Sequence, residues 1–91
     1  MTAILLHFED EQVPAERLAH ALGLASRLVE RHRFPDEELR LRLPVDASGA
    51  LPETLVVYRS LARPNDKLIE LMLVARQARL LGSRRIMLVA P

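Results

Sequence analysis

The sequence predicts an α/β fold in which helices flank a mostly parallel sheet and an antiparallel hairpin projects from it. Residues 64–91 combine a helical pattern with an unbroken apolar run, Ile86–Val89, as expected for a strand covered on both faces. Glu38–Leu43 alternates strictly between polar and apolar residues, which is typical of a strand with one wet face. Ala3–Phe8 and Thr54–Tyr58 are short apolar runs that we expect to pair in the parallel sheet.

The first half of the chain opens with the strand Ala3–Phe8. The acidic triplet Glu9–Glu11 leads to Pro14, which suits the first turn of a helix ending at Gly23. This helix has one apolar face, made by Ala15, Leu18, Ala19 and Leu22. Leu28–Phe34 is a poorer strand candidate because charged residues occupy both of its faces, so we place it at an edge or half in solvent.

A hairpin is expected next. Residues 35–37 separate Leu28–Phe34 from the alternating strand Glu38–Leu43, so the two should pair antiparallel across an acidic turn. The arginines of the second strand lie on its open face, and the hairpin should therefore project from the main sheet. Pro44–Pro52 contains a glycine between its prolines and is predicted to be a surface loop.

The main helix follows the central strand Thr54–Tyr58. Asn65 and Asp66 are its expected N-cap residues, and Gly82 should end it. Its apolar face is predicted from residues at three- and four-residue spacing, namely Leu68, Leu71, Met72, Ala75 and Ala78. Ile69 and Leu73 lie off this face, so either another subunit covers them or they are scattered surface residues.

Composition limits the classes of function. Ninety-one residues allow one domain, residues 1–91, and a formal charge of +1 predicts no nucleic-acid partner. No apolar segment is long enough to span a membrane and no leader is recognisable, so we expect a cytoplasmic protein without a membrane partner. The absence of cysteine excludes disulfides and cysteine-ligated metals. The last strand stops at Ala90 and Pro91, where a ligand site would begin, and this predicts a truncated chain.

Single residues do not identify a chemistry. His7, His20 and His32 are far apart in sequence, without ligand spacing or a nearby nucleophile. The helix start at Ser60–Asp66 could hold an anion, although Asp66 would repel one. The acidic turn beside Phe34 is most simply a solvated turn, and the chain has no glycine-rich phosphate loop.

Two stretches resemble the first domain of the ribose-phosphate pyrophosphokinases, the PRPP synthetases. The family's Asn-Asp-x-Leu-x-Glu-Leu helix, with a following strand that ends in proline, is matched by Asn65, Asp66, Leu68, Glu70, Leu71 and Pro91. The family's turn Phe-x-Asp/Asn-Gly-Glu is matched by Phe34, Asp36 and Glu38. Element order and spacing agree over essentially the whole chain, so it resembles an N-terminal fragment of this family, with the beginning of a phosphoribosyltransferase-like fold.

The resemblance implies a parent enzyme that transfers the diphosphoryl group of ATP to ribose 5-phosphate with Mg²⁺, forming PRPP and AMP for nucleotide biosynthesis. It implies a homo-oligomer in which the turn reaches a neighbouring subunit's ATP site. Phe34 would stack on adenine, and Asp36 and Glu38 would accept hydrogen bonds from its exocyclic amine or through water. The catalytic and Mg²⁺-binding segments would lie downstream, so this chain should hold no catalytic or metal-binding residue and be inactive alone.

Three departures from the family pattern leave alternatives open. Glu37 replaces the glycine of the turn, Lys67 stands where asparagine is common, and Arg59-Ser60 replaces a Gln-Ser pair with a shift of one position. One alternative is a non-catalytic relative that serves as an assembly or regulatory subunit. Another is an α/β module that shares only the fold, which alone would license no function.

Overall fold

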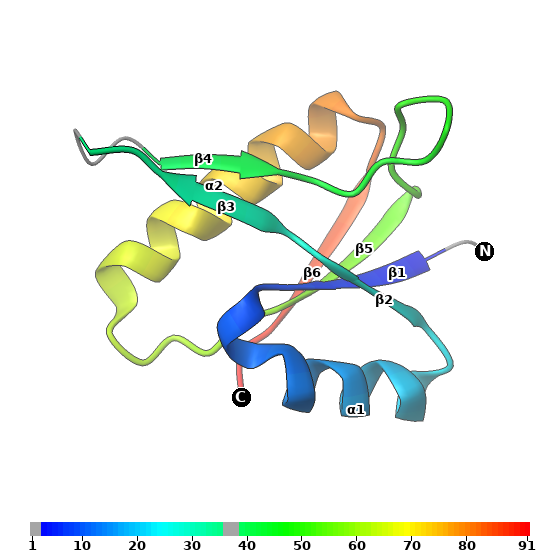
Figure 1. Cartoon of the computed structure of the whole chain (residues 1–91). Helices are drawn as coiled ribbons and strands as arrows, with labels where there is room; N and C mark the ends of the chain where they lie inside the picture. Colours follow the sequence, from blue (N-terminus) through cyan, green and yellow to red (C-terminus); the bar gives the residue numbers. More distant parts are fainter. Residues whose placement is uncertain (1–2, 36–38) are drawn as a thin grey trace.

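Four parallel strands form a sheet in the order β2-β1-β5-β6, and two further strands form a separate antiparallel hairpin, β3-β4 (Figure 1). The structure is a computed structural model that describes residues 3–35 and 39–91. Along the chain the elements are β1 (Ala3–His7), the 3₁₀ turn η1 (Glu9–Glu11), α1 (Gln12–Leu22), β2 (Ala25–Leu28), β3 (Glu30–Arg33), β4 (Leu39–Arg42), β5 (Thr54–Tyr58), α2 (Pro64–Leu80) and β6 (Arg85–Val89). The predicted α/β class, with its parallel sheet and antiparallel hairpin, is confirmed.

The sheet separates two apolar layers, because alternate residues of β1 and β5 point to opposite faces. Leu5 of β1 and Val56 of β5 face α1 and pack with its buried Ala15 and Ala19. The other face of the sheet is covered by α2 and by the hairpin. In Figure 1 these two elements lie behind and above the sheet. That layer is centred on these buried residues: Leu6, Phe8, Val29, Leu41, Leu43, Leu55, Val57, Val74 and Ala78.

The segment predicted as one strand, Leu28–Phe34, overlaps two strands with different partners, β2 and β3. Its first residue ends β2, which pairs parallel with β1 at the sheet edge. Val29 is fully buried, and its N–H donates to the carbonyl of His7 at 2.8 Å. The chain then leaves the sheet as β3. Burial of this one valine between two charged half-strands explains why the sequence pattern of the segment is poor.

The hairpin confirms the strongest alternation in the sequence. Leu41 pairs with Arg31 and is buried, whereas Arg40 and Arg42 are exposed on the outer face. Leu41 therefore attaches the hairpin to the apolar layer under it. The predicted acidic turn, residues 36–38, lies outside the described residues.

The predicted cap and apolar face of α2 need correction. Arg63 occupies the N-cap position with φ 58° and no side-chain cap bond forms, so Asn65 and Asp66 do not cap the helix. Leu68 and Met72 are 47% and 72% exposed. Of the predicted face, Ala78 is buried and Leu71 packs partly buried against the core, while the other buried residues of α2 are Glu70 and Val74. The helix is rotated from the predicted position because a charged residue, Glu70, belongs to its buried face.

The residues of α2 that lie off its predicted apolar face, Ile69 and Leu73, are covered in part by this chain itself. Leu73 is partly buried and packs against the layer that contains Leu41 of the hairpin. Ile69 stays 54% exposed and lines a shallow hollow with Leu39 of the hairpin, so its cover is incomplete.

Strand β6 is also less covered than its apolar sequence predicted. It lies at the end of the sheet in the described part of the chain and pairs with β5 alone, which leaves Met87 and Leu88 about half exposed. Across residues 3–35 and 39–91, neither helix has the length and apolar character needed to span a bilayer.

Candidate functional site

Phe34 is the one residue of the predicted adenine contact that lies among the described residues. Phe34 follows β3 directly and is 37% exposed. The ring of His32 meets it edge-on, with 4.3 Å between centroids and an interplanar angle of 71°. The guanidinium carbon of Arg40 lies 5.5 Å from the Phe34 ring centroid. Asp36 and Glu38 lie outside the described residues, so their role as adenine partners stays a prediction.

His32 and Arg40 are directly opposite each other in the hairpin ladder. Both side chains contact the ring of Phe34, and the residue remains 37% exposed. An aromatic ring held in this way can stack on a planar base, and a neighbouring guanidinium can add a cation–π contribution. The tip is therefore suited to contact a base, and that role of Phe34 also stays a prediction.

A second candidate is a group of charged side chains at the carboxyl edge of the sheet, where β1 runs into η1 and β5 into the loop before α2. In open α/β sheets this edge is the usual place of ligand sites. We call the group the ion cluster, and its members are Glu9, Asp10, Glu11, Arg31, Arg59 and Glu70. None of the six was singled out as a site residue from the sequence.

Arg59 is the centre of the ion cluster and is only 1% exposed. Its Nη1 donates to a carboxylate oxygen of Asp10 at 2.7 Å and to one of Glu11 at 2.8 Å. Its Nη2 and Nε donate to Oε1 of Glu70 at 2.6 and 3.1 Å. Three carboxylates therefore satisfy one buried guanidinium, as burial of a charge requires.

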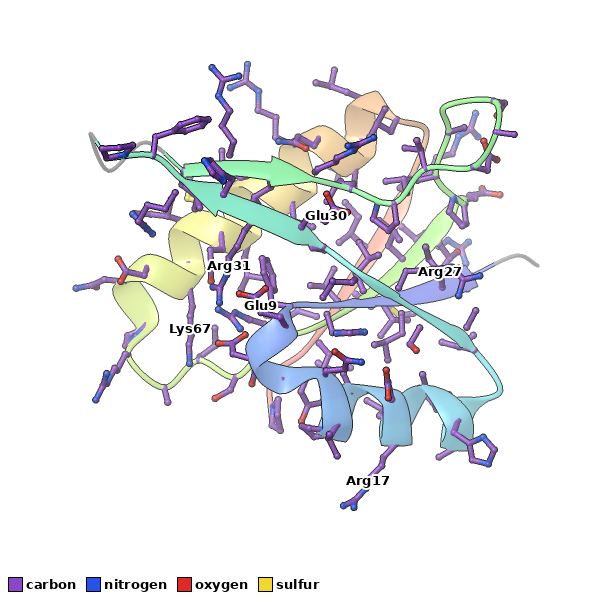
Figure 2. The ribbon with its side chains drawn as sticks, viewed as in Figure 1. Glu9, Arg17, Arg27, Glu30, Arg31 and Lys67 are labelled. Carbon is purple, nitrogen blue, oxygen red and sulfur yellow. The ribbon has the colours of Figure 1, made fainter. Side chains whose placement is uncertain are left out.

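Glu70 connects this centre to the hairpin. Its Oε1 accepts from Arg59, while its Oε2 accepts a short hydrogen bond from Nη1 of Arg31 on β3. Arg31 also bonds Glu9 at 2.8–2.9 Å, and Figure 2 shows its side chain pointing from the hairpin toward Glu9. Both guanidinium groups lie against the buried Phe8 ring, with carbon-to-centroid distances of 5.3 Å for Arg31 and 4.4 Å for Arg59.

The cluster shifts the pKa of several members. Burial disfavours the charge on Arg59 and Arg31, but hydrogen bonds and attraction from their carboxylate partners outweigh it and raise both guanidinium pKa values. Burial also acts to raise the pKa of Asp10. The hydrogen bond from Arg59 and the positive charges of Arg59 and Arg31 outweigh that effect, so the pKa of Asp10 is lowered.

Part of the segment Ser60–Asp66, which was considered for an anion, is already used from within the chain, four residues before α2 begins. The backbone N–H of Ser60 points at Glu11 and donates to its two carboxylate oxygens at 3.0 and 3.2 Å. An external anion that used these two donors would have to displace the carboxylate of Glu11.

The chemistry available to the ion cluster is limited. It contains four carboxylates and two guanidinium groups, so its carboxylates exceed its cations and it does not attract phosphate. The described residues include no group of histidine, aspartate or glutamate side chains arranged to hold a metal ion. His7, His20 and His32 lie on β1, α1 and β3, and the buried His7 has Nδ1 3.2 Å from the carbonyl of Phe8. We therefore interpret the cluster as a structural connection between η1, β3, the end of β5 and α2.

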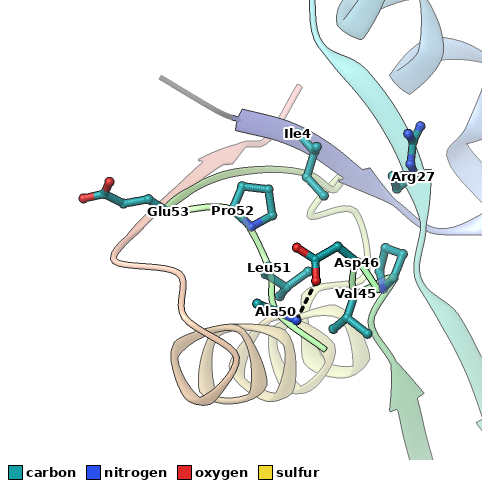
Figure 3. Close-up of a pocket in the computed structure, with 9 residues that line it drawn as sticks. Ile4, Arg27, Val45, Asp46, Ala50, Leu51, Pro52 and Glu53 are labelled. Carbon is teal, nitrogen blue, oxygen red and sulfur yellow. Dashed lines mark hydrogen bonds between the residues drawn. The ribbon is translucent and has the colours of Figure 1, made fainter. Parts of the chain in front are cut away.

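A hollow of about 520 Å³ opens at the opposite, amino-terminal edge of the sheet (Figure 3). Asp46 belongs to its wall, and one carboxylate oxygen of Asp46 accepts from Ser48 N–H at 2.8 Å, Ser48 Oγ at 2.5 Å and Ala50 N–H at 3.1 Å. These hydrogen bonds lower the pKa of Asp46, and the bond from the Ser48 hydroxyl has the largest effect. The carboxylate is thus used to close its own loop.

Comparison with known proteins supports the resemblance. The sequence model of the family described as the N-terminal domain of ribose phosphate pyrophosphokinase matches residues 3–91. A purine phosphoribosyltransferase from Pyrococcus horikoshii OT3 has a similar structure, with a TM-score of 0.63 at 23% identity. The similarity covers 93% of this chain and 57% of that protein, and at this identity it shows a shared fold alone. No curated protein matches the sequence significantly.

Proposed function

The chain belongs to the family of N-terminal domains of ribose phosphate pyrophosphokinases, and from this premise we propose that its parent protein is a ribose-phosphate diphosphokinase. The parent transfers the diphosphoryl group of ATP to ribose 5-phosphate and forms PRPP and AMP. The part of this chain in that reaction is to supply the hairpin tip as an adenine contact. Asp36 and Glu38 accept hydrogen bonds from the base, and the tip serves the ATP site of a neighbouring subunit in a homo-oligomer.

One observation carries the proposal. Phe34 is part-exposed on a hairpin that is not paired with the sheet, and two side chains of that hairpin hold its ring. A preordered ring loses little conformational entropy when a base stacks on it, so most of the stacking energy of about 1–3 kcal/mol contributes to binding.

The rest of the reaction is assigned to other parts of the parent protein. No side-chain group suited to Mg²⁺ occurs in the described ranges, and the ion cluster carries excess negative charge. In this proposal, other segments of the parent protein hold Mg²⁺, the triphosphate and ribose 5-phosphate. A cytoplasmic location is part of the same proposal, since ATP and ribose 5-phosphate are intracellular metabolites.

The test is kinetic and uses the parent protein, with PRPP formation measured while ATP or ribose 5-phosphate is varied. Phe34→Leu removes the ring but keeps an apolar side chain, and Phe34→Tyr keeps the ring as the matched control. Loss of about 1–3 kcal/mol should raise the KM for ATP about 5- to 150-fold in Phe34→Leu, and Phe34→Tyr should stay near the parent value. The KM for ribose 5-phosphate should change much less in both.

Two results would contradict the proposal. Unchanged ATP kinetics in Phe34→Leu would show that the adenine site is elsewhere. A parent protein that folds and assembles but forms no PRPP from ATP, Mg²⁺ and ribose 5-phosphate would instead indicate an assembly or regulatory subunit.

The chain by itself should bind ATP only weakly. Stacking and one or two hydrogen bonds are opposed by the cost of association, so the dissociation constant should be millimolar or weaker, about −4 kcal/mol at best. Titration of the 91-residue chain with ATP, followed by NMR shifts of its residues near Phe34, measures this value. A micromolar constant would show that the chain contains a more complete nucleotide site than the one proposed.

A further inference from the structure

Glu70 is a buried charge in the middle of a helix face, and the proposed function gives it no role. It is 2% exposed and lies on α2 between the hairpin and the end of β5. Its two oxygens are divided between two arginines from different elements, Oε1 to Arg59 and Oε2 to Arg31. A carboxylate used in this way connects a hairpin, a helix and a sheet through one side chain.

The hairpin needs such a connection because its ladder is separate from the sheet. β3 and β4 pair only with each other among the described strands, so no main-chain ladder fixes their angle to β1 and β5. Leu41 attaches the hairpin by an apolar contact, which is non-directional. The hydrogen bonds of Arg31 are directional, and charge-assisted bonds are the stronger kind. Arg31 therefore adds a directional restraint on the hairpin, beside the main-chain bond from Val29 to His7 where β3 leaves the sheet.

The position of the tip depends on this angle. Phe34 follows Arg31 by three residues, which is about 10 Å of extended strand, so a swing of about 15° at Arg31 would move the tip by about 2–3 Å. Displacements of about 1 Å at a reacting site can already cost orders of magnitude in rate.

We infer that Glu70 is a positioning residue: by sharing its carboxylate between Arg31 and Arg59, it fixes the angle of the β3-β4 hairpin and thereby the place of Phe34. Replacement by glutamine removes the charge that both arginines share. Each arginine keeps another carboxylate partner, Glu9 for Arg31 and the Asp10–Glu11 pair for Arg59. Glu70→Gln should therefore fold and lose the connection selectively.

The first arm of the test measures the hairpin angle and does not depend on the proposed function. The chain has no cysteine, so spin labels at Arg17→Cys on α1 and Pro35→Cys at the tip are unique, and both positions are exposed. Pulsed electron paramagnetic resonance then reports the distance between them. In Glu70→Gln we expect the distribution to shift or widen by about 2–3 Å. Glu53→Gln, an exposed glutamate before β5, is the matched control and should leave it unchanged.

Arg31→Gln provides a second variant, which breaks the same connection from the hairpin side and leaves the bonds between Glu70 and Arg59 intact. It should reproduce the shift or widening. A distribution that superimposes on that of the parent in folded Glu70→Gln overturns the inference. If circular dichroism shows that Glu70→Gln is unfolded, the same criterion applies to Arg31→Gln.

The second arm rests on the proposed function and uses the parent enzyme. Glu70→Gln should raise the KM for ATP by about tenfold, with the KM for ribose 5-phosphate unchanged. A changed distance distribution with an unchanged KM for ATP would overturn the role in ATP binding. A parent protein that forms no PRPP would refute the proposed function and leave the result of the first arm standing.

Discussion

Removal of Arg59 is the most direct single test of whether the ion cluster stabilises the fold. In Arg59→Met the side chain keeps a similar length and can still pack against Phe8, but Asp10, Glu11 and Glu70 lose their shared partner. Glu70 then lies buried with Arg31 alone. Breaking a buried ion pair by removing one partner costs about 3–5 kcal/mol, because the other partner is left charged in a poorly solvated place.

The lower end of this range is the appropriate magnitude here. Glu11 keeps the N–H of Ser60, Glu70 keeps Arg31, and Asp10 is about half in solvent. We therefore expect the free energy of unfolding to fall by about 3 kcal/mol. For a domain of this length such a loss lowers Tm by about 12–24 °C.

Urea denaturation followed by far-ultraviolet circular dichroism measures the loss, since the chain has no tryptophan. Arg79→Met is the matched control because Arg79 is exposed on α2, and its effect should lie within about 0.5 kcal/mol. The double variant Arg59→Met/Glu70→Gln should be more stable than the sum of the single effects predicts, by about 0.5–3 kcal/mol. A loss below about 1 kcal/mol in Arg59→Met would refute the description of Arg59 as a buried ion-pair centre, because that is the range of an exposed salt bridge.

Three further predictions test separate features. The lowered pKa of Asp10 means that its contribution to stability is present above its unfolded pKa of about 3.9 and is lost as pH falls from there through the folded value. The difference in urea midpoint between the parent and Asp10→Asn should therefore be larger at neutral pH than at low pH, and an equal difference at both would contradict the shift. Gly23 has φ 70°, and its replacement by alanine should cost about 1–2 kcal/mol in the same urea assay through backbone strain alone, since nothing lies within 4 Å of an added Cβ. Val74→Ala should lower the free energy of unfolding by more than about 1 kcal/mol, and Met72→Ala should lower it by less than about 0.5 kcal/mol. The reverse order would show that α2 buries the apolar face predicted from the sequence.

The elements that could be predicted are those in which the local pattern of polar and apolar residues matches the burial of the side chains. Leu39–Arg42 alternates in sequence and in burial, and Thr54–Tyr58, mostly apolar in sequence, is buried at every residue. Periodicity failed where tertiary contacts decided burial. Glu70 counts as a surface residue in any hydrophobic pattern, yet two arginines make its burial tolerable, and α2 turns accordingly.

The ion cluster was hidden for a related reason. Its partners are 11 to 49 residues apart in sequence, so no short motif contains them. One signal was available. An acidic triplet follows the first parallel strand and a lone arginine follows the next one in the sheet, and the carboxyl ends of parallel strands meet at one edge. Applied to these two strands, that rule brings Glu9–Glu11 and Arg59 to the same edge from the sequence alone.

The use of this edge by internal charges has a consequence for the division of labour in the parent protein. Glu11 takes the N–H of Ser60 and a bond from Arg59, so two donors that could have met a phosphate are already satisfied. A phosphate that displaced Glu11 would leave a carboxylate without its partners beside three others, and the desolvation cost would oppose binding. The first domain therefore gains rigidity at this edge and gives up a phosphate site there. In the proposed function the nucleotide contact is therefore Phe34, which lies beyond the cluster on the hairpin and is 37% exposed.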